Sequence, residues 1–201
     1  MQSGGYYKAW VNLRSYPILL LLFSAGLAAL AADNYPMLAA LLIKPQNKYA
    51  NAGKEPLILS VFPYAVIDDD IGRLLPDMDK RRTPASDYLV DALSSSSPLR
   101  EYIPEQEDLE DKFDRLEYLI SLSIIDNALQ TSSGSWAPIG RFGWRFRRSG
   151  NHYISSRVQN ELDTEKENWK PLKAGFLGGS LERAIAAQNG VIEILKRVPW
   201  W

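Results

Sequence analysis

Residues 16–43 read YPILLLLFSAGLAALAADNYPMLAALLI, and the fold depends on how this apolar stretch is interpreted. Its uninterrupted apolar part, residues 17–32, would form a helix roughly 24 Å long at about 1.5 Å per residue. The hydrocarbon core of a membrane is about 30 Å thick and needs about 20 apolar residues. Because Arg14 precedes the run and Asp33 follows it, the stretch is short for a membrane span.

A secretion signal is the second interpretation of the same stretch. Lys8 and Arg14 precede the apolar block, and the small residues at 29–32 would allow cleavage near Ala31 or Ala32. The leader is unusual for a signal, however, because its aromatic residues already recur at helical spacing before the apolar block begins. Export with removal of the leader therefore stays an alternative.

A helical hairpin is the third interpretation, and it is the one we favour. Small residues replace large ones from Ser24 onward, which lets a neighbouring helix approach closely. Asp33 and Asn34 favour a tight turn, and Pro36 suits the first turn of a returning helix. The pattern resembles one unit of a tetratricopeptide-like repeat, although no second copy follows at a fixed period. We therefore expect a buried hairpin in a cytoplasmic protein.

Composition excludes several kinds of chemistry. The 201 residues include no cysteine and one histidine, which excludes disulfides, thiolate metal sites and the HExxH motif. Lys and Arg number 23 and Asp and Glu 24, so the net charge of −1 gives no general attraction to nucleic acid or to an anionic membrane. We expect one domain over residues 1–201 and no cofactor.

Helical periodicity dominates the rest of the chain, so we predict a mainly α fold of about seven or eight helices with little strand. The clearest helices are expected at residues 84–93, 104–129, 152–163 and 181–197. The serine run at 94–98 is a candidate internal linker. Residues 57–67 form an apolar run too short to assign to strand or helix.

Apolar stripes on these helices form the predicted core. On the long helix, four residues share one face at helical spacing: Leu109, Phe113, Leu116 and Ile120. Other residues expected to face the core are Tyr153, Val158, Leu162, Leu181, Ile185, Val191, Ile192 and Leu195. The long helix is also preceded and opened by acidic residues, eight of them between positions 101 and 117.

The segment RFGWRFRR, residues 141–148, is the strongest local signal for binding. Read as a strand, it places Arg141, Gly143, Arg145 and Arg147 on one face and the aromatic residues on the other. The candidate binding residues are Arg141, Trp144, Arg145, Arg147 and Arg148. In one interpretation the arginines bind phosphates while the rings stack on bases. In the other, the rings fill the core and the arginines pair with the acidic residues of 101–117.

No spacing selects a catalytic residue. Asp87, Asp91 and Glu117 are carboxylates that could act as acid or base in a pocket, but no motif singles them out. The DDD run at 68–70 does not match the spacing of a calcium-binding loop. The glycines before Ser180 are explained by a turn followed by a helix cap.

Three stretches together resemble a known kind of protein: residues 16–42, SWAPIGRFGWR at 135–145 and LKAGFLGGSLERA at 172–184. They are similar to the helical C-terminal regions of large bacterial and archaeal multidomain proteins. In those proteins the region follows a sirtuin-like or P-loop NTPase effector domain, and many are associated with defence against phage. The resemblance attaches no catalytic residue to these stretches, and it implies a module separated from its effector domain.

These observations lead us to expect a non-enzymatic helical module for protein interaction or regulation. Its partner would be another protein or a second copy of the chain. The first alternative is nucleic-acid or nucleotide-phosphate binding through residues 141–148. The second alternative is an exported or membrane-anchored envelope protein, which the shortness of the apolar run disfavours.

Overall fold

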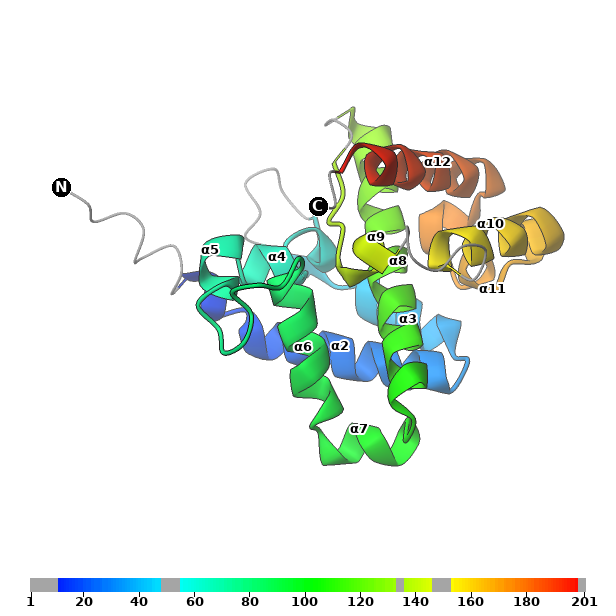
Figure 1. Cartoon of the computed structure of the whole chain (residues 1–201). Helices are drawn as coiled ribbons and strands as arrows, with labels where there is room; N and C mark the ends of the chain where they lie inside the picture. Colours follow the sequence, from blue (N-terminus) through cyan, green and yellow to red (C-terminus); the bar gives the residue numbers. More distant parts are fainter. Residues whose placement is uncertain (1–10, 48–54, 133–135, 146–152, 199–201) are drawn as a thin grey trace.

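The computed structural model describes residues 11–47, 55–132, 136–145 and 153–198, and it is mainly helical, as expected (Figure 1). In the described part, six helices have eight or more residues: α2 (Tyr16–Ala31), α3 (Tyr35–Leu42), α6 (Pro84–Ser94), α8 (Gln106–Thr131), α10 (Ile154–Glu165) and α12 (Leu181–Arg197). Shorter α-helices join them: α4 (Pro63–Val66), α5 (Asp69–Gly72), α7 (Ser97–Tyr102), α9 (Arg141–Arg145) and α11 (Lys170–Lys173). The 3₁₀ turns are η1 (Leu57–Leu59), η3 (Lys166–Asn168) and η4 (Phe176–Gly179).

Strand structure in the described residues is limited to one antiparallel pair, β1 (Gln46–Asn47) and β2 (Glu55–Pro56). Residues 57–67 are helical and contain η1 and α4. Pro63 begins α4, where its fixed backbone angle suits a first helical turn and its missing N–H costs nothing. The serine run at 94–98 is the corner at which α6 ends and α7 begins.

Helix α8 runs through the middle of the molecule, and the other long helices pack around it (Figure 1). The predicted stripe is confirmed, because Leu109, Phe113, Leu116 and Ile120 are each at most 1% exposed. Phe113 meets Phe23 of α2 at a ring-centroid distance of 5.1 Å. The core therefore forms where the N-terminal helix crosses α8.

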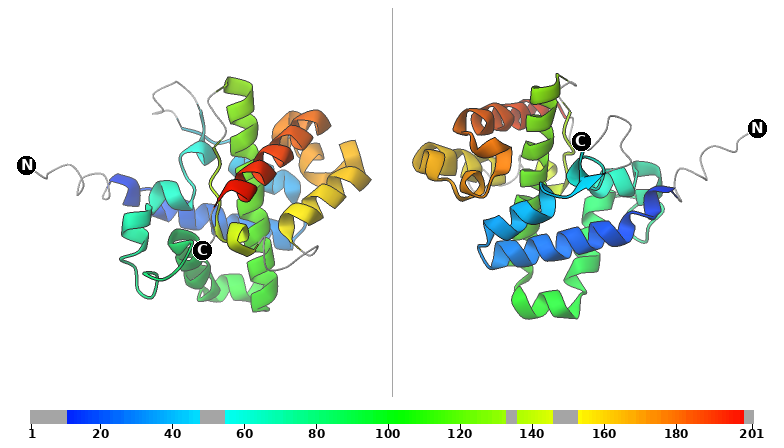
Figure 2. Two further views of the ribbon diagram at one scale, coloured as in Figure 1. Left: turned by 45° about the horizontal axis from the view of Figure 1, so that its top comes forward. Right: turned by 180° about the vertical axis from the view of Figure 1, so that it is seen from behind.

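The predicted hairpin is present, with α2 and α3 lying side by side (Figure 2, right). Asp33 takes a left-handed backbone conformation at the turn, with φ 51°, which Asp tolerates better than most residues. The Asn34 side chain then caps α3 by accepting a hydrogen bond of 3.0 Å from the Met37 N–H. Likeness to a tetratricopeptide repeat stays a prediction.

Two glycines, one in α2 and one in α12, allow these two helices to approach α8 closely. A Cβ atom on Gly26 of α2 would lie 2.9 Å from Leu116, and one on Gly190 of α12 would lie 2.8 Å from Ile125. Both distances are shorter than a real Cβ contact, so with any larger residue either the facing side chain or the helix would have to shift. The prediction that small residues in α2 permit tight helix packing is confirmed at Gly26.

Helix α12 is tied to two neighbours by one buried amide. The Tyr118 hydroxyl on α8 donates to Gln188 Oε1 over 2.8 Å, and Gln188 Nε2 donates to the Ser155 carbonyl of α10 over 2.9 Å. Val191 and Leu195 are fully buried, as expected. Ile185 was expected in the core and is 42% exposed, because it lies one position beyond the stripe of α12 that packs against its neighbours.

The length estimate for the N-terminal helix needs correction. Helical structure continues backward through Arg14, and a helix over Val11–Ala31 has 21 residues and a mean hydropathy of 1.7. By length and composition alone this helix is able to cross a membrane. A core helix or a signal sequence passes the same test, and 39% of its most apolar window is buried.

Candidate functional site: two charged faces of helix α8

The charged residues of α8 fall on two faces beside the apolar stripe. Glu110, Asp114 and Glu117 follow one another at spacings of four and three, so they share the face toward α9. Asp111 follows Glu110 and Arg115 follows Asp114 in the sequence, so these two residues lie on a neighbouring side of α8. There they line a cleft toward α10 and α11. We describe these as the α9 face and the cleft face.

The segment predicted as a strand forms the short helix α9, Arg141–Arg145. The prediction of alternating faces is therefore wrong. In a helix, Arg141 and Arg145 lie on the same side one turn apart, and this spacing matches that of Glu110 and Asp114 on α8. The long-range match to two carboxylates, which the segment itself does not contain, decides between strand and helix.

The helix also determines where the aromatic side chains of this segment lie. Phe142 is fully buried and meets Tyr118 edge-on, with ring centroids 5.3 Å apart and an interplanar angle of 77°. Trp144 is half-buried. Arg147 and Arg148, the other two candidate binding residues, lie outside the described residues.

Both described arginines of the segment are held by carboxylates of the α9 face. Arg141 Nη2 lies 2.7 Å from Glu110 Oε2, and Arg145 Nη1 lies 2.6 Å from Asp114 Oδ2. Arg141 Nε lies 3.5 Å from Asp114 Oδ1, and neither atom has a hydrogen-bond partner among the described residues. Of the two interpretations of this segment, the one that pairs its arginines with the acidic helix agrees with these contacts.

Glu117 is the most deeply buried carboxylate of the α9 face, with 4% exposure. Ser86 of α6 donates to its Oε1 over 2.6 Å, and the backbone N–H of Arg141 donates to its Oε2 over 3.0 Å. The carboxyl group lies directly against Gly140, where a Cβ atom would be 2.1 Å from Oε2. The neighbouring cavity has a volume of only about 10 Å³, enough for about one water.

The α9 face holds more acid than base. Three carboxylates on α8 face two guanidinium groups on α9, and Asp87 of α6 lies nearby under the influence of Arg141. Burial raises the pKa of Glu117 to about 8, with the negative charge of Asp114 adding to it. Burial also raises the pKa of Asp114 to about 6 against the opposing charges of Arg145 and Arg141. The surroundings of Glu117 therefore favour its protonated form.

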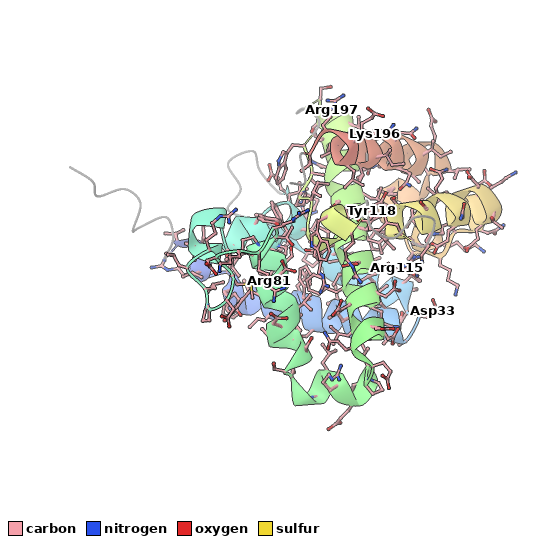
Figure 3. All side chains as sticks on the ribbon, in the orientation of Figure 1. Asp33, Arg81, Arg115, Tyr118, Lys196 and Arg197 are labelled. Atoms are coloured by element: carbon pink, nitrogen blue, oxygen red, sulfur yellow. The ribbon has the colours of Figure 1, made fainter. Side chains whose placement is uncertain are left out.

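The cleft face borders a cavity of about 280 Å³ that four elements build together. The lining residues are Leu30, Asp33, Tyr35, Asp111, Lys112, Arg115, Arg157, Glu161, Glu165, Trp169 and Lys170. Figure 3 shows two of them, Arg115 on α8 and Asp33 at the tip of the α2–α3 hairpin, on the same side of the molecule. Residues distant in sequence thus meet in one small polar cleft.

A fixed hydrogen-bond network forms the floor of this cleft. Arg115 binds Glu161 with both ends of its guanidinium group, at 2.8 and 2.7 Å, and its Nε donates to the Tyr35 hydroxyl over 2.8 Å. Trp169, which is 1% exposed, donates its indole N–H to Glu161 over 2.7 Å. Burial alone would raise the pKa of Glu161, but the hydrogen bonds and charge of Arg115 outweigh it and lower that pKa.

The rim of the cleft consists of ion pairs that reach solvent. Arg157 pairs with Asp111, and Lys170 pairs with Asp33 at the hairpin tip. The Lys170 and Asp33 side chains are 59% and 62% exposed. Such exposed pairs contribute little to stability, typically about 0–1 kcal/mol, so they exchange partners easily.

A second cavity of about 420 Å³ lies beside η1 and η4. Its charged lining residues are Asp126 and Arg183, which bind each other in a two-pronged contact with Nε to Oδ1 at 2.8 Å. Its charged groups are thus fewer than those of the cleft face, and they are matched to each other. The cleft face offers more varied chemistry.

Comparison with known proteins gives no match: no protein-family model, no curated protein and no solved structure is similar to the chain. The resemblance to the C-terminal regions of large effector proteins therefore stays a prediction.

The most distinctive residues of both faces were not singled out as a site by the sequence. Tyr35 and Arg115 are 80 positions apart, and Arg115 and Glu161 are 46 apart. Glu117 was named as a carboxylate among others, and its only local sign was its position in an otherwise apolar stretch of the long helix. A charge within such a stretch is a usable signal for a buried ionisable group.

Proposed function

We propose that this protein is a non-enzymatic helical interaction module that pairs with a second copy of itself through α2. The observation that carries this proposal is a stripe of apolar side chains on the solvent side of the N-terminal helix. Val11, Ile18 and Leu21 are 56%, 44% and 71% exposed. Their spacings of seven and three place them on one side of a helix, the pattern by which one helix packs against another.

The stripe has a shape that suits pairing with itself. Beyond Ile18 and Leu21 it continues through Ala25 and Ala28, which are half-buried. If two copies of α2 lie antiparallel about a two-fold axis near residue 23, Ile18 faces Ala28 and Leu21 faces Ala25. At both of these levels a large residue then meets a small one, which suits a closed two-fold interface.

The alternative of nucleic-acid binding gains no support from the described arginines. The guanidinium groups of Arg141 and Arg145 already contact Glu110 and Asp114, so a phosphate would have to displace buried carboxylates. A role for Glu117 as a catalytic acid or base also gains none. Its carboxyl group is buried against Gly140, beside a cavity too small for a substrate.

Export or membrane anchoring is the second candidate, favoured by the length and hydropathy of the helix over Val11–Ala31. The packing of α2 argues for retention of this helix in the folded protein. Leu19, Phe23 and Leu27 are 0% exposed, so cleavage near Ala31 would remove part of the core. The intact mass of protein purified from its native host tests this candidate: loss of residues 1–32 would establish export.

Size-exclusion chromatography with light scattering tests the proposed pairing. We expect the full chain to form a dimer, and Leu21→Glu to convert it to a monomer with unchanged circular dichroism. The matched control is Ile185→Glu, which alters an isoleucine of α12 that is also exposed and should leave the dimer intact. A wild-type chain that stays monomeric at every accessible concentration would refute the proposal.

A sedimentation assay with lipid vesicles separates self-pairing from membrane binding by the same stripe. We expect the wild-type dimer to stay in the supernatant with neutral or anionic vesicles. Co-sedimentation that Leu21→Glu abolishes would assign the stripe to a membrane surface instead. We further propose that the dimer acts in the cytoplasm as a counterpart of the C-terminal regions of larger effector proteins, which an effector gene directly upstream would support.

A further inference from the structure

The cleft face has the features of a small-molecule site that goes beyond the proposed pairing through α2. Its cavity of about 280 Å³ is slightly smaller than the usual ligand pocket, which measures roughly 300–1,000 Å³. It therefore suits a ligand the size of a free amino acid and excludes one the size of a dinucleotide. The lining comes from the hairpin tip, α8, α10 and the α11 region, so a ligand would touch four elements at once.

The floor of the cleft is already organised. Arg115 is 9% exposed and uses three N–H groups on Glu161 and Tyr35. A guanidinium group has five N–H donors, which leaves two without a hydrogen-bond partner among the described residues. Because Glu161, Tyr35 and Trp169 hold Arg115 in place, these donors are fixed before a ligand arrives, and an anion would lose little by ordering them.

The lining charges are balanced, which limits the class of ligand. Four side chains are basic and four are acidic: Lys112, Arg115, Arg157 and Lys170 against Asp33, Asp111, Glu161 and Glu165. A polyanion such as a nucleotide would be repelled by the acidic residues as strongly as it is attracted by the basic ones. A molecule that carries one positive and one negative group satisfies both sets.

The rim supplies partners for both ends of such a molecule. Exposed ion pairs are weak, so a carboxylate can replace Asp33 at Lys170 or Asp111 at Arg157 with little loss. The carboxylate released in this way is then free to accept an ammonium group. The rim can thus open its own ion pairs and rebuild them around the ligand.

We propose that the cleft binds a small zwitterion with a carboxylate and an ammonium group, of the size of a free amino acid. The carboxylate contacts Arg115 and the basic rim residues, and the ammonium group contacts the acidic rim residues. The bound molecule would join the hairpin tip to α10 and α11. The pairing through α2 and the ligand site in the cleft are independent, so either proposal can fail while the other stands.

Isothermal titration and thermal melting of the full chain test the proposal with the twenty proteinogenic amino acids at millimolar concentration. We expect at least one to bind and to raise the melting temperature, because a ligand that binds only the folded state stabilises it. The N-acetyl and the carboxamide forms of that amino acid each lack one charge. Each should bind at least tenfold more weakly. If either form binds as tightly as the parent, or if none of the twenty binds, the proposal is overturned.

Variants locate the binding to the cleft. Lys170→Ala and Arg157→Ala alter exposed rim residues, so both should fold and each should weaken binding about tenfold or more. Lys196→Ala is the matched control, because it removes a lysine of equal exposure from a pair on α12. The indole N–H signal of Trp169, assigned by Trp169→Phe, should shift on binding. Binding that survives both rim variants would place the ligand elsewhere and overturn the assignment.

Discussion

The two charged faces of α8 use the same chemistry and give carboxylates of opposite character. On the cleft face one guanidinium group, that of Arg115, holds one carboxylate with both ends, and the pKa of Glu161 falls. On the α9 face the two guanidinium groups bind Glu110 and Asp114 and leave Glu117 to uncharged donors, and the pKa values of Asp114 and Glu117 rise while that of Glu110 falls. The ratio of acid to base and the depth of burial decide the outcome, although the ion pairs on both faces have similar lengths.

The difference shows most clearly in the direct partners of each carboxylate. Glu161 receives charged hydrogen bonds from Arg115 that favour its ionised form. Glu117 receives neutral hydrogen bonds from the Ser86 hydroxyl and the Arg141 backbone, which do not compensate for its complete burial. The cleft face is therefore stable with its charges present, and the α9 face is stable with a proton present.

The largest effect is expected on the cleft face. Arg115→Ala leaves Glu161 and Tyr35 without their shared partner, and breaking a buried ion pair of this kind costs about 4 kcal/mol of unfolding free energy. Urea denaturation measures the loss. Lys196→Ala, which breaks an exposed pair, should leave stability unchanged. A loss from Arg115→Ala no larger than that of this control would show that the cleft network does not stabilise the fold.

On the α9 face, the next largest effect should come from the aromatic anchor. Phe142→Ala removes a fully buried ring that packs on Tyr118, and such truncations cost about 3 kcal/mol. The same denaturation experiment applies, with Tyr102→Ala as a control because this ring is 75% exposed. Equal effects of the two variants would mean that α9 is held by its arginines alone.

The close approach of Gly140 to Glu117 gives a smaller effect. Gly140→Ala places a methyl group where the carboxyl group lies, so the side chain must move away from its two hydrogen-bond donors. Overpacking of this kind costs roughly 2 kcal/mol. If melting temperatures show Gly140→Ala to be as stable as wild type, the tight position of Glu117 beside the glycine is not needed.

The last expected effect is a pH dependence that belongs to the α9 face. Because the pKa of Glu117 is raised to about 8 in the fold, the folded protein holds a proton that the unfolded chain releases near the ordinary glutamate value. Stability from this group is complete at acid pH and is lost as the pH rises to about 8. We expect the unfolding free energy to fall as the pH rises from 5 to 8 and to level off above pH 8.

Glu117→Gln separates this dependence from other groups. The amide copies the protonated carboxyl group, since its oxygen accepts from the Arg141 N–H and its nitrogen donates to the Ser86 hydroxyl, which turns from donor to acceptor. In this variant the unfolding free energy should no longer change with pH above pH 6. The change below pH 6 should remain, because it comes from Asp114, whose pKa is about 6. A profile identical to that of wild type would assign the dependence to another group.

Local periodicity was sufficient to predict the elements whose structure depends on their own sequence. The hairpin with its cap at Asn34 and the stripe of α8 follow from spacings of three and four residues and from short capping signals. The strand predicted for 141–148 is wrong over its described part, 141–145, because two-residue alternation is a local signal, whereas this part pairs with carboxylates on a distant helix. Ile185 failed for a related reason, because an apolar residue next to a helix stripe looks the same in sequence as one within it.

The two charged faces depend on contacts that no short stretch of sequence contains. Arg115 gains its character from Tyr35, Glu161 and Trp169, which three other elements supply. The raised pKa of Glu117 depends on burial beneath α6 and α9. The eight acidic residues between 101 and 117 predicted a source of counter-charge, but their division into a matched face and an acid-rich face required the fold.

The side-chain amide of Gln188 limits the sequence changes that α12 can tolerate. Its oxygen must accept from Tyr118 while its nitrogen donates to the Ser155 carbonyl, a combination that glutamate and leucine lack and that asparagine is one carbon too short to span. Sliding α12 by one turn, about 5.4 Å, would leave a phenol and a carbonyl buried without partners. One side chain thus fixes the register of the last helix along α8, and insertions within α12 on either side of it should be tolerated far less than substitutions on its exposed face.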